Sequence, residues 1–475
     1  MAKAPQKPEK SRRPGKRPPL PTIEVDIARL DDDGVAVGRH EGKDVLVAGA
    51  LPGEKVVAAI ERTGQRRIVA RLRKVLTRHP DRITPACGHT GACQGCSLIA
   101  MAYGAQLRFK EVKVRAALAG YPRLKGTEVH PVWAAPQPLG YRTNAKLVMG
   151  KERGQVKIGL YRRGTHEVVD IGDCPLHHPL INRIVAVVRE EVARQEIFIY
   201  NPEKKRGLLR YLVVKVSPAF GKAMVTFVTA ERNYREVTHL AKWLQKKVPE
   251  VVSVQQNVNP SEGNAIFGRE TLRILGTPDL LDQVGDIRLR IAPASFFQVN
   301  NEQAARIYAL VRQWAQLSRQ EVALDLYCGI GGIALHLAAD AGRVIGIESV
   351  EEAVRNAKEN ARMNGLANCT FLAGDAAELI EDLVSQVPPG SVAVLNPPRS
   401  GCERQVLEAF VELQPRTLIY VSCAPETLAR DLDILAGLGY RTAEVQPVDM
   451  FPQTPHVESV ARLVPAGEVK ASKKR

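Results

Sequence analysis

The sequence predicts an α/β protein with three structured parts: an N-terminal OB-like β-barrel, a central mixed α/β domain and a C-terminal Rossmann-like domain. Three observations carry this prediction. Short β-rich runs separated by turn signals fill the region from Pro21 to Arg78. A strand–loop–helix rhythm repeats from about Ile287 and predicts a doubly wound parallel sheet. Between these regions stands a segment with three of the eight cysteines.

Charge and hydropathy limit the class of partner. The 475-residue chain has a formal net charge of +16, which favours a polyanion such as RNA, although a membrane surface would also attract it. The sequence contains no apolar run of the roughly 20 residues that a membrane-spanning helix needs. It also lacks the apolar region of a signal peptide at its N-terminus. We therefore expect a cytoplasmic monomer that does not enter a membrane.

The N-terminal part begins with residues 1–19, a Pro-rich basic stretch that is expected to be a disordered tail, like residues 468–475. Residues 20–79 contain five β-rich runs, and DDDG, EGK, PGE and TGQ mark the turns between them. Five short strands at this spacing predict a small closed barrel.

Residues 80–97 form a cysteine-rich segment. Cys87, Cys93 and Cys96 follow one another with five and two intervening residues, and Cys174 comes much later in IGDCPLHHP. Three closely spaced thiolates and a distant fourth predict a metal site, which could hold zinc or an iron–sulfur cluster. Residues 98–286 are expected to form the central domain.

Residues 287–467 carry the pattern of a nucleoside-binding sheet. The run ALDLYCGIGG is an apolar strand followed by a Gly-rich turn, which lets a ligand approach a helix N-terminus. Glu348 ends the next strand and suits ribose hydroxyls, while Asp375 is placed for an adenine edge. Asn396 begins the later Asn-Pro-Pro run. An NAD site is the rival, but the G-x-G-x-x-G spacing is absent, so we predict S-adenosylmethionine.

Cys423 stands in IYVSCAPETLARD, where a strand ends and a helix begins. The helix dipole and nearby cations are expected to lower its pKa. Together with Gln298 in SFFQVN, Asn396 and Glu458 in FPQTPHVES, it should lie at the carboxyl edge of the sheet. A thiolate that adds to C6 of uracil makes C5 nucleophilic toward a sulfonium methyl group, and Glu458 could then remove the C5 proton.

These motifs, with GVAVGRHEGKDVLVAGALPGE in the barrel, resemble the RumA/TrmA family of RNA (uracil-5-)-methyltransferases. The resemblance covers nearly the whole chain, and the barrel resembles a TRAM domain. It implies that Cys423 is the nucleophile and Glu458 the general base. It implies that Gln298, Tyr327, Glu348 and Asn396 contact the cofactor. It also implies a [4Fe–4S] cluster held by Cys87, Cys93, Cys96 and Cys174.

The resemblance is greatest to the RumA (RlmD) type, which acts on 23S rRNA, at a uridine that is flipped out or already single-stranded. Asn396 departs from that type, which has Asp there, and agrees with the RumB (RlmC) type. Another rRNA uridine or a tRNA therefore remains an alternative target.

Two other functions compete with this interpretation. Asn-Pro-Pro also occurs in amino-group methyltransferases, but an aromatic residue usually follows it there, and Arg399 follows it here. A non-catalytic RNA-binding protein would not need Cys423, Glu458 and Gln298 together. The basic residues expected to contact phosphates are Arg142, Lys146, Arg162 and Arg163. One of Phe296 and Phe297 is expected to stack on a base, and the other is expected to belong to the core.

Overall fold

The computed structural model describes residues 20–467, except residues 94, 163–164, 264 and 385 and the side chain of residue 381. The two predicted tails and Arg163 therefore lie outside the described residues. The chain divides into two compact units, one up to Arg82 and one from Ile83 onward.

The first unit is a closed five-stranded barrel, which confirms the prediction. Its strand order is β1-β2-β3-β5-β4. Alternate side chains such as Val25, Ile27, Val45 and Val47 fill its interior. A Cβ at Gly38 would lie 2.3 Å from a Val25 methyl group, so only glycine lets β2 approach β1 this closely. The strands are β1 (Thr22–Leu30), β2 (Ala36–His40), β3 (Lys43–Ala48), β4 (Lys55–Thr63) and β5 (Arg67–Thr77).

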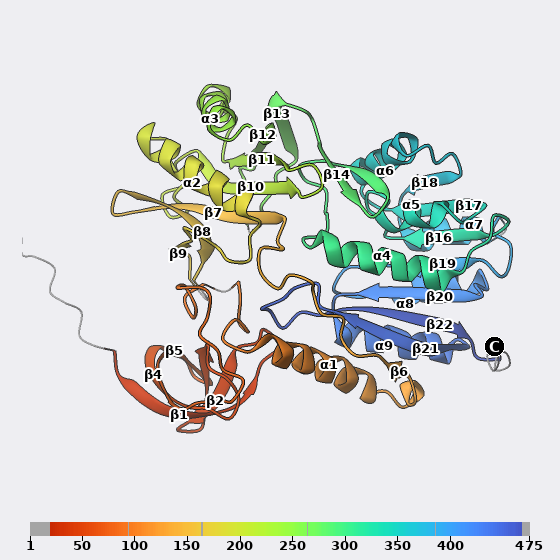
Figure 1. Cartoon of the computed structure of the whole chain (residues 1–475), viewed down its shortest axis with the longest axis horizontal. Helices are drawn as coiled ribbons and strands as arrows, with labels where there is room; N and C mark the ends of the chain where they lie inside the picture. Colours follow the sequence, from red (N-terminus) through yellow and green to blue (C-terminus); the bar gives the residue numbers. More distant parts are fainter. Residues whose placement is uncertain (1–19, 94, 163–164, 264, 385, 468–475) are drawn as a thin grey trace, which may run out of the picture. The chain divides into compact units, whose positions relative to one another are not determined.

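The second unit contains the central sheet, with the strand order β13-β12-β11-β10-β7-β8-β9. Helices α2 and α3 pack on one face of it, over a core that includes Leu212, Val214 and Phe227 (Figure 1). The strands are β7 (Asn144–Glu152), β8 (Gln155–Tyr161), β9 (Val168–Asp170), β10 (Leu209–Ser217), β11 (Lys222–Thr229), β12 (Val251–Val258) and β13 (Glu270–Gly276). The helices are α2 (Pro179–Arg194) and α3 (Tyr234–Lys247).

The same unit contains an eight-stranded sheet with the order β18-β17-β16-β19-β20-β22-β21-β6. Strands β18 to β20 are parallel, and β22 is inserted antiparallel between β20 and β21. This arrangement confirms the predicted Rossmann-like sheet. The strands are β16 (Val322–Leu326), β17 (Arg343–Glu348), β18 (Cys369–Ala373), β19 (Val392–Leu395), β20 (Thr417–Ser422), β21 (Tyr440–Val448) and β22 (Glu458–Pro465).

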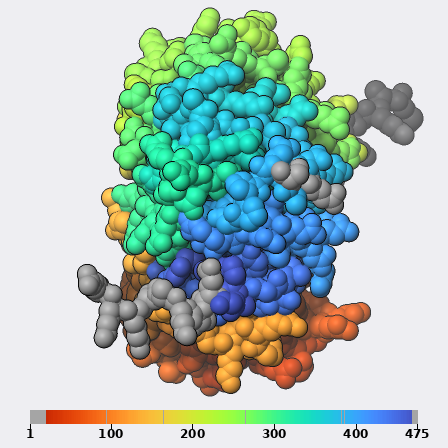
Figure 2. Space-filling model, turned by 90° about the vertical axis from the view of Figure 1, so that its right-hand side faces the viewer, coloured from red at the N-terminus to blue at the C-terminus, as the bar shows by residue number. Residues whose placement is uncertain are grey.

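Helices cover both faces of this sheet. One apolar core holds α4 (Asn301–Ala315), α5 (Gly332–Ala338) and α6 (Glu351–Met363). The other holds α7 (Ala376–Leu383), α8 (Arg404–Glu412) and α9 (Pro425–Gly437). Figure 2 shows the green, teal and blue segments that follow about residue 280 forming one continuous face.

Two elements differ from the expected division of the chain. Helix α1 (Tyr103–Ala119) packs on α9, and β6 (Glu128–Val129) extends the methyltransferase-like sheet beside β21. Residues from 98 to about 135 thus belong to this sheet rather than to the central domain. Strands β14 (Leu280–Val284) and β15 (Ile287–Ile291) pair with each other across the expected boundary at residue 286.

In the part of the chain that the structure describes, no helix is both long and apolar enough to cross a membrane.

Candidate active site

Cys423 lies between β20 and α9, as the sequence predicted. Strand β20 pairs antiparallel with β22, and Ser422 lies opposite Ser459 in that register. Cys423 and Glu458 are the next residues beyond this pair, and the Glu458 carboxylate lies close enough to raise the pKa of Cys423. The pairing therefore brings together two residues that are 35 positions apart in the sequence.

Arg399 is a third ionisable side chain next to Cys423 and Glu458. It stands in the turn after β19, and its guanidinium donates a hydrogen bond to the Cys423 sulfur. The same guanidinium also attracts the Glu458 carboxylate. Sequence reasoning used Arg399 only to argue against amino-group methylation and missed this contact. The available signal was an arginine directly after a Pro-Pro pair at the end of a parallel strand.

The Cys423 thiol and the Glu458 carboxyl group both resist ionisation. Glu458 is 4% exposed, and burial raises its pKa to about 7 while Arg399 acts in the opposite direction. Burial and the Glu458 carboxylate also raise the pKa of Cys423, and Arg399 offsets part of that rise. The expectation of a lowered Cys423 pKa is therefore wrong, because desolvation outweighs the cation and the helix N-terminus.

Three of the predicted cofactor residues line one cavity at the carboxyl ends of β16 and β19. They are Gln298, Tyr327 and Asn396. The Gly-rich turn after β16 contributes Gly329 and Gly332 to the same cavity. Ligands of doubly wound sheets bind at this edge.

The Gly-rich turn depends on a close approach by α4. A Cβ at Gly332 would lie 2.8 Å from the Tyr308 hydroxyl oxygen, so no larger residue fits without movement. Gly331 adopts a φ of 89°, and Tyr327 adopts a φ of 62°, which is unusual for a residue with a side chain. Such backbone strain is concentrated at functional sites.

Asp325 is a cavity residue that sequence reasoning did not assign as a ligand contact. It is 1% exposed, and its Oδ2 accepts a hydrogen bond of 2.8 Å from the Ala334 amide. Its Oδ1 has no hydrogen-bond partner within the described residues. Burial raises the pKa of Asp325 to about 7. An acidic residue near the end of an apolar strand, just before a Gly-rich turn, was the signal for it.

Glu348 and Asp375 are held by main-chain groups. Glu348 ends β17 and accepts hydrogen bonds from the Gly329 amide at 3.0 Å and the Val350 amide at 2.9 Å. It thus braces the Gly-rich turn instead of lining the cavity described above. Asp375 caps α7 by accepting a hydrogen bond of 2.8 Å from the Ala377 amide.

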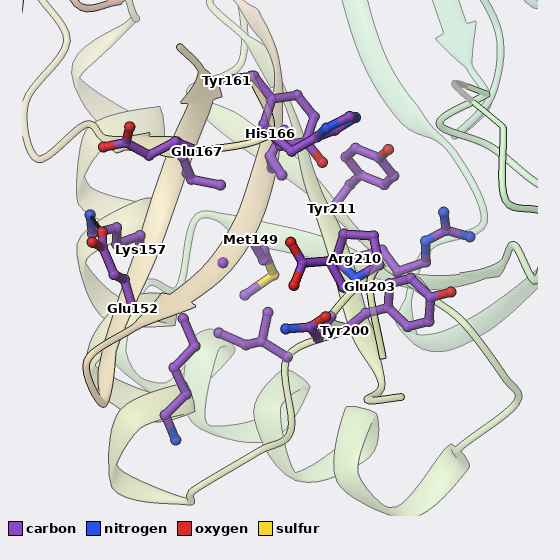
Figure 3. A pocket seen from close by; sticks show the side chains of 17 residues that line it. Met149, Glu152, Lys157, Tyr161, His166, Glu167, Tyr200, Glu203, Arg210 and Tyr211 are labelled. Carbon is purple, nitrogen blue, oxygen red and sulfur yellow. Dashed lines mark hydrogen bonds and ion pairs between the residues drawn. The ribbon is translucent and has the colours of Figure 1, made fainter. Parts of the chain in front are cut away.

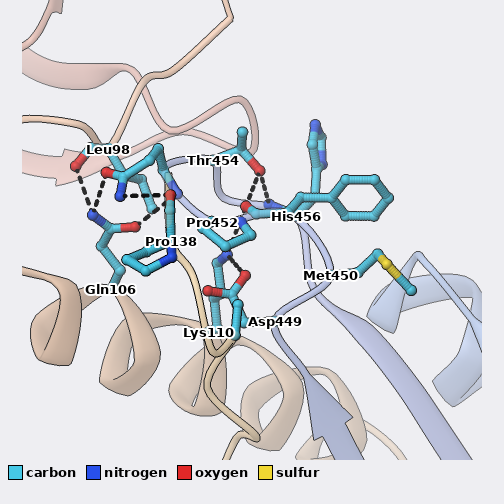
Figure 4. Close-up of polar contacts among 12 residues, drawn as sticks. Leu98, Gln106, Lys110, Pro138, Asp449, Met450, Pro452, Thr454 and His456 are labelled. Carbon is cyan, nitrogen blue, oxygen red and sulfur yellow. Dashed lines mark hydrogen bonds and ion pairs between the residues drawn. The ribbon is translucent and has the colours of Figure 1, made fainter. Parts of the chain in front are cut away.

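The segment that leads to Glu458 is anchored on α1 by a buried ion pair (Figure 4). Lys110 and Asp449 are both fully buried and form this pair. The second oxygen of Asp449 accepts a hydrogen bond of 2.9 Å from the Tyr103 hydroxyl. Lys110 also donates to the Phe451 carbonyl at 3.0 Å.

A reciprocal amide pair lies next to this ion pair. Gln106 donates to the Gln453 side chain at 2.9 Å and accepts from the Gln453 amide at 2.9 Å. The Leu98 amide donates to the Gln453 carbonyl at 3.0 Å. Leu98 comes two residues after Cys96, so the cysteine-rich segment and the loop before Glu458 share one hydrogen-bond network.

The four predicted metal ligands line a common cavity, together with Arg142 and His177. The thiol sulfurs accept main-chain hydrogen bonds, as from His89 to Cys87 and from Gly95 to Cys93, both 3.4 Å. Burial and the other three thiols raise the pKa of Cys96. Among the described residues, no three cysteine, histidine, aspartate or glutamate side chains are placed so that they could hold one metal ion.

The predicted RNA contacts are scattered. Phe297 is 8% exposed and belongs to the core, whereas Phe296 is 76% exposed, so one of the two is core as expected. Lys146 lies 5.5 Å from the Phe267 ring centre. Arg162 pairs with Glu167 at 3.1 Å.

Comparisons with known proteins agree with this geometry. The family model "tRNA (Uracil-5-)-methyltransferase" matches residues 102–464, and the TRAM domain model matches residues 21–66. An uncharacterized RNA methyltransferase of Geobacter sulfurreducens is 52% identical, over 93% of this chain and 90% of that protein. One of Caldanaerobacter subterraneus is 40% identical, over 92% and 97%.

A solved structure is similar over almost the whole chain. It is the tRNA (uracil-54, C5)-methyltransferase of Pyrococcus abyssi in complex with S-adenosyl-L-homocysteine. It is 30% identical, with a TM-score of 0.73, and the match covers 93% of this chain and 100% of that one. The chain therefore belongs to the S-adenosylmethionine-dependent RNA (uracil-5-)-methyltransferase family, and carries the TRAM domain as its N-terminal barrel.

Proposed function

We propose that the chain methylates C5 of a uridine in 23S rRNA, with Cys423 as nucleophile and Glu458 as general base. The placement of Cys423 opposite Glu458, at the edge of the sheet that holds the cofactor cavity, carries this proposal. Neither an amino-group methyltransferase nor a passive RNA-binding protein needs a thiol beside a buried carboxyl group.

The reaction begins at the sulfur. The Cys423 thiol gives its proton to solvent, and the resulting thiolate bonds to C6 of the uracil, so that the electrons of the C5–C6 double bond become available at C5. Arg399 stabilises the thiolate through the hydrogen bond that it donates to the sulfur. Bound S-adenosylmethionine would supply the electrophilic methyl group, and S-adenosylhomocysteine would be the leaving group.

The second half of the reaction needs a base. C5 now carries both the methyl group and its original hydrogen, and Glu458 takes that proton. The electrons of the C5–H bond re-form the C5–C6 double bond, and the bond between sulfur and C6 breaks. With a pKa of about 7, Glu458 can accept this proton at neutral pH and release it afterwards.

Gln298, Tyr327 and Asn396 would hold the cofactor, since they line the cavity at the Gly-rich turn. The contact of Glu348 with the ribose stays a prediction, since Glu348 accepts a hydrogen bond from the Gly329 amide and does not line this cavity. Asp325 joins this set because one of its buried oxygens lacks a partner within the described residues.

The four cysteines would hold a [4Fe–4S] cluster. Their convergence on one cavity and the main-chain amides donated to sulfur support this, because such hydrogen bonds tune cluster thiolates. Zinc is the second candidate. Iron content and visible absorption of protein purified without oxygen decide between them, since zinc is colourless.

Two RNAs are candidate substrates, 23S rRNA and tRNA. The net charge and the TRAM barrel support RNA, and the RumA-type motifs favour 23S rRNA. The similar Pyrococcus abyssi enzyme, by its name, acts on tRNA at uridine 54. Mapping 5-methyluridine in rRNA and tRNA from cells with and without the gene tests both, and a change in neither RNA would reject the proposal.

Cys423→Ala should abolish methyl transfer and leave the fold and S-adenosylmethionine binding intact. The wild type should form a covalent adduct with RNA that contains 5-fluorouridine. Fluorine replaces the C5 hydrogen, so the base has no proton to remove and the bond between sulfur and C6 does not break. Cys402→Ala, a buried cysteine outside the pair, is the matched control. An alanine variant at 423 that still methylates uridine would exclude the mechanism.

A further inference from the structure

The central sheet carries a hollow of about 730 Å³ that the proposed reaction does not use (Figure 3). Four π-faced side chains line it, and Figure 3 shows them gathered around it with the Glu203 carboxylate. They are Tyr161, His166, Tyr200 and Tyr211. We call this the central hollow.

Arg210 fixes two of these rings. Its guanidinium lies 4.8 Å from the Tyr200 ring centre and 5.9 Å from that of Tyr211. Arg210 is itself 8% exposed and donates to the carbonyl oxygens of Asn259 at 2.5 Å and Ser261 at 2.6 Å. Arg210 therefore holds the Tyr200 and Tyr211 side of the aromatic wall in place.

The hollow faces the same side of the sheet as the cofactor loop. Tyr211 and Lys215 are four residues apart on β10, so their side chains share a face and lie roughly 13 Å apart. Lys215 donates to the carbonyl oxygens of Ala292 at 2.9 Å and Ser295 at 2.6 Å, three residues before Gln298. An RNA strand whose uridine reaches the cofactor cavity can extend along this face.

The charges around the hollow match an RNA base rather than a phosphate. Glu152 pairs with Lys157 and Glu167 with Arg162, but Glu203 has no ion pair or hydrogen bond within the described residues. An unpaired carboxylate repels phosphate and accepts N–H donors. Lys151 also lines the hollow and is exposed, and Lys204 and Arg206 are exposed in the same loop as Glu203, where they could contact the RNA backbone. Aromatic faces inside and cations outside are typical of single-strand binding sites.

We propose that the central hollow is a second nucleobase site, which stacks an unpaired guanine of the RNA substrate while Glu203 accepts its N1 and N2 protons. Guanine is the base that presents two adjacent N–H donors to one carboxylate. This inference rests on the proposed function only in that the substrate is RNA.

The test measures binding of the full chain to short single-stranded RNAs by fluorescence anisotropy. Each RNA has one 5-fluorouridine in a cytidine tract and one guanosine, which is moved by one position at a time. We expect one position to bind about tenfold tighter than the others. Tyr200→Leu should remove this preference, and Tyr200→Phe should retain it. Equal affinity at all positions, or a preference that survives Tyr200→Leu, would overturn the proposal.

Two further comparisons sharpen the assignment. Inosine lacks the N2 amino group, so it should bind the wild type more weakly than guanosine, and Glu203→Gln should remove that difference. An unchanged difference in this exposed variant would reject the contact. Tyr234→Leu, an exposed tyrosine at the start of α3, is the control and should behave as the wild type.

Covalent trapping of 5-fluorouridine in the same RNAs reports on the proposed reaction independently. A guanosine preference without trapping would contradict the reaction and leave the site intact. Trapping without any preference would contradict the site alone.

Discussion

Arg399 places one positive charge beside a thiol and a carboxyl group whose pKa values are both raised by burial. Its guanidinium is the group that lowers the cost of ionising either one. In the proposed mechanism, the reactivity of the site thus depends on a residue whose side chain does not itself need to bond to the uracil.

Replacing Arg399 with Gln should slow adduct formation with 5-fluorouridine RNA by about tenfold at pH 7, since the loss of one charge-assisted hydrogen bond costs over 1 kcal/mol. The pH at which the rate levels off should move upward as the Cys423 pKa rises. Arg399→Lys should restore part of the rate. A pH profile identical to that of the wild type would show that Arg399 has no electrostatic role.

The raised pKa of Glu458 leads to a second prediction, which concerns the free energy of unfolding. Its pKa is near 7 in the folded chain against 4.5 for a free glutamate, so folding binds its proton more tightly. Stability from this group is full below about pH 4.5 and is lost as pH rises toward 7. Glu458→Gln should therefore raise the free energy of unfolding at pH 8 by up to about 3 kcal/mol. Urea denaturation at pH 8 and pH 5 measures it, and an equal change at both values would contradict it.

The sequence motifs predicted Cys423 and Glu458 as the reacting pair, but they could not give the sign of the cysteine's pKa shift. That sign depends on how deeply the sulfur is buried and on the carboxylate opposite it, which the β20–β22 register alone determines. Asp325 shows the same limit, because its unpaired oxygen is visible only when all neighbours are placed.

Helix α1 shows why one element was assigned to the wrong part of the chain. Its buried positions include Gln106 and Lys110, which a hydrophobic pattern places in solvent. Their partners, Gln453 and Asp449, come more than 300 residues later. By contrast, the barrel strands and β16 to β20 have regular apolar patterns bounded by turns, and the sequence predicted all of them.

Removing one partner of the Lys110–Asp449 pair should destabilise the second unit, because a buried charge is left without compensation. We expect Lys110→Met to cost about 3 kcal/mol, and Lys110→Met with Asp449→Leu to recover most of it. Trp133, Trp243 and Trp314 all lie after Arg82, so tryptophan fluorescence in urea reports on this unit alone. Additive losses in the double variant would show that the pair is not coupled.

The four cysteines bring together distant segments of the chain in one cavity. Cys174 comes from the central domain, and the other three come from the segment before α1. Cys174→Ser should reduce iron content and visible absorption together, as a cluster loses one of four ligands. Cys369→Ser, in a half-buried strand position, should retain both. Full iron content in the Cys174 variant would exclude it as a ligand.

In the proposed mechanism, the insertion of β22 between β20 and β21 supplies the general base late in synthesis. A nascent polypeptide that has not yet been extended through residue 465 would already contain Cys423 but would lack the complete paired strand that carries Glu458. Such an unfinished chain could at most attach itself to a uridine without turning over.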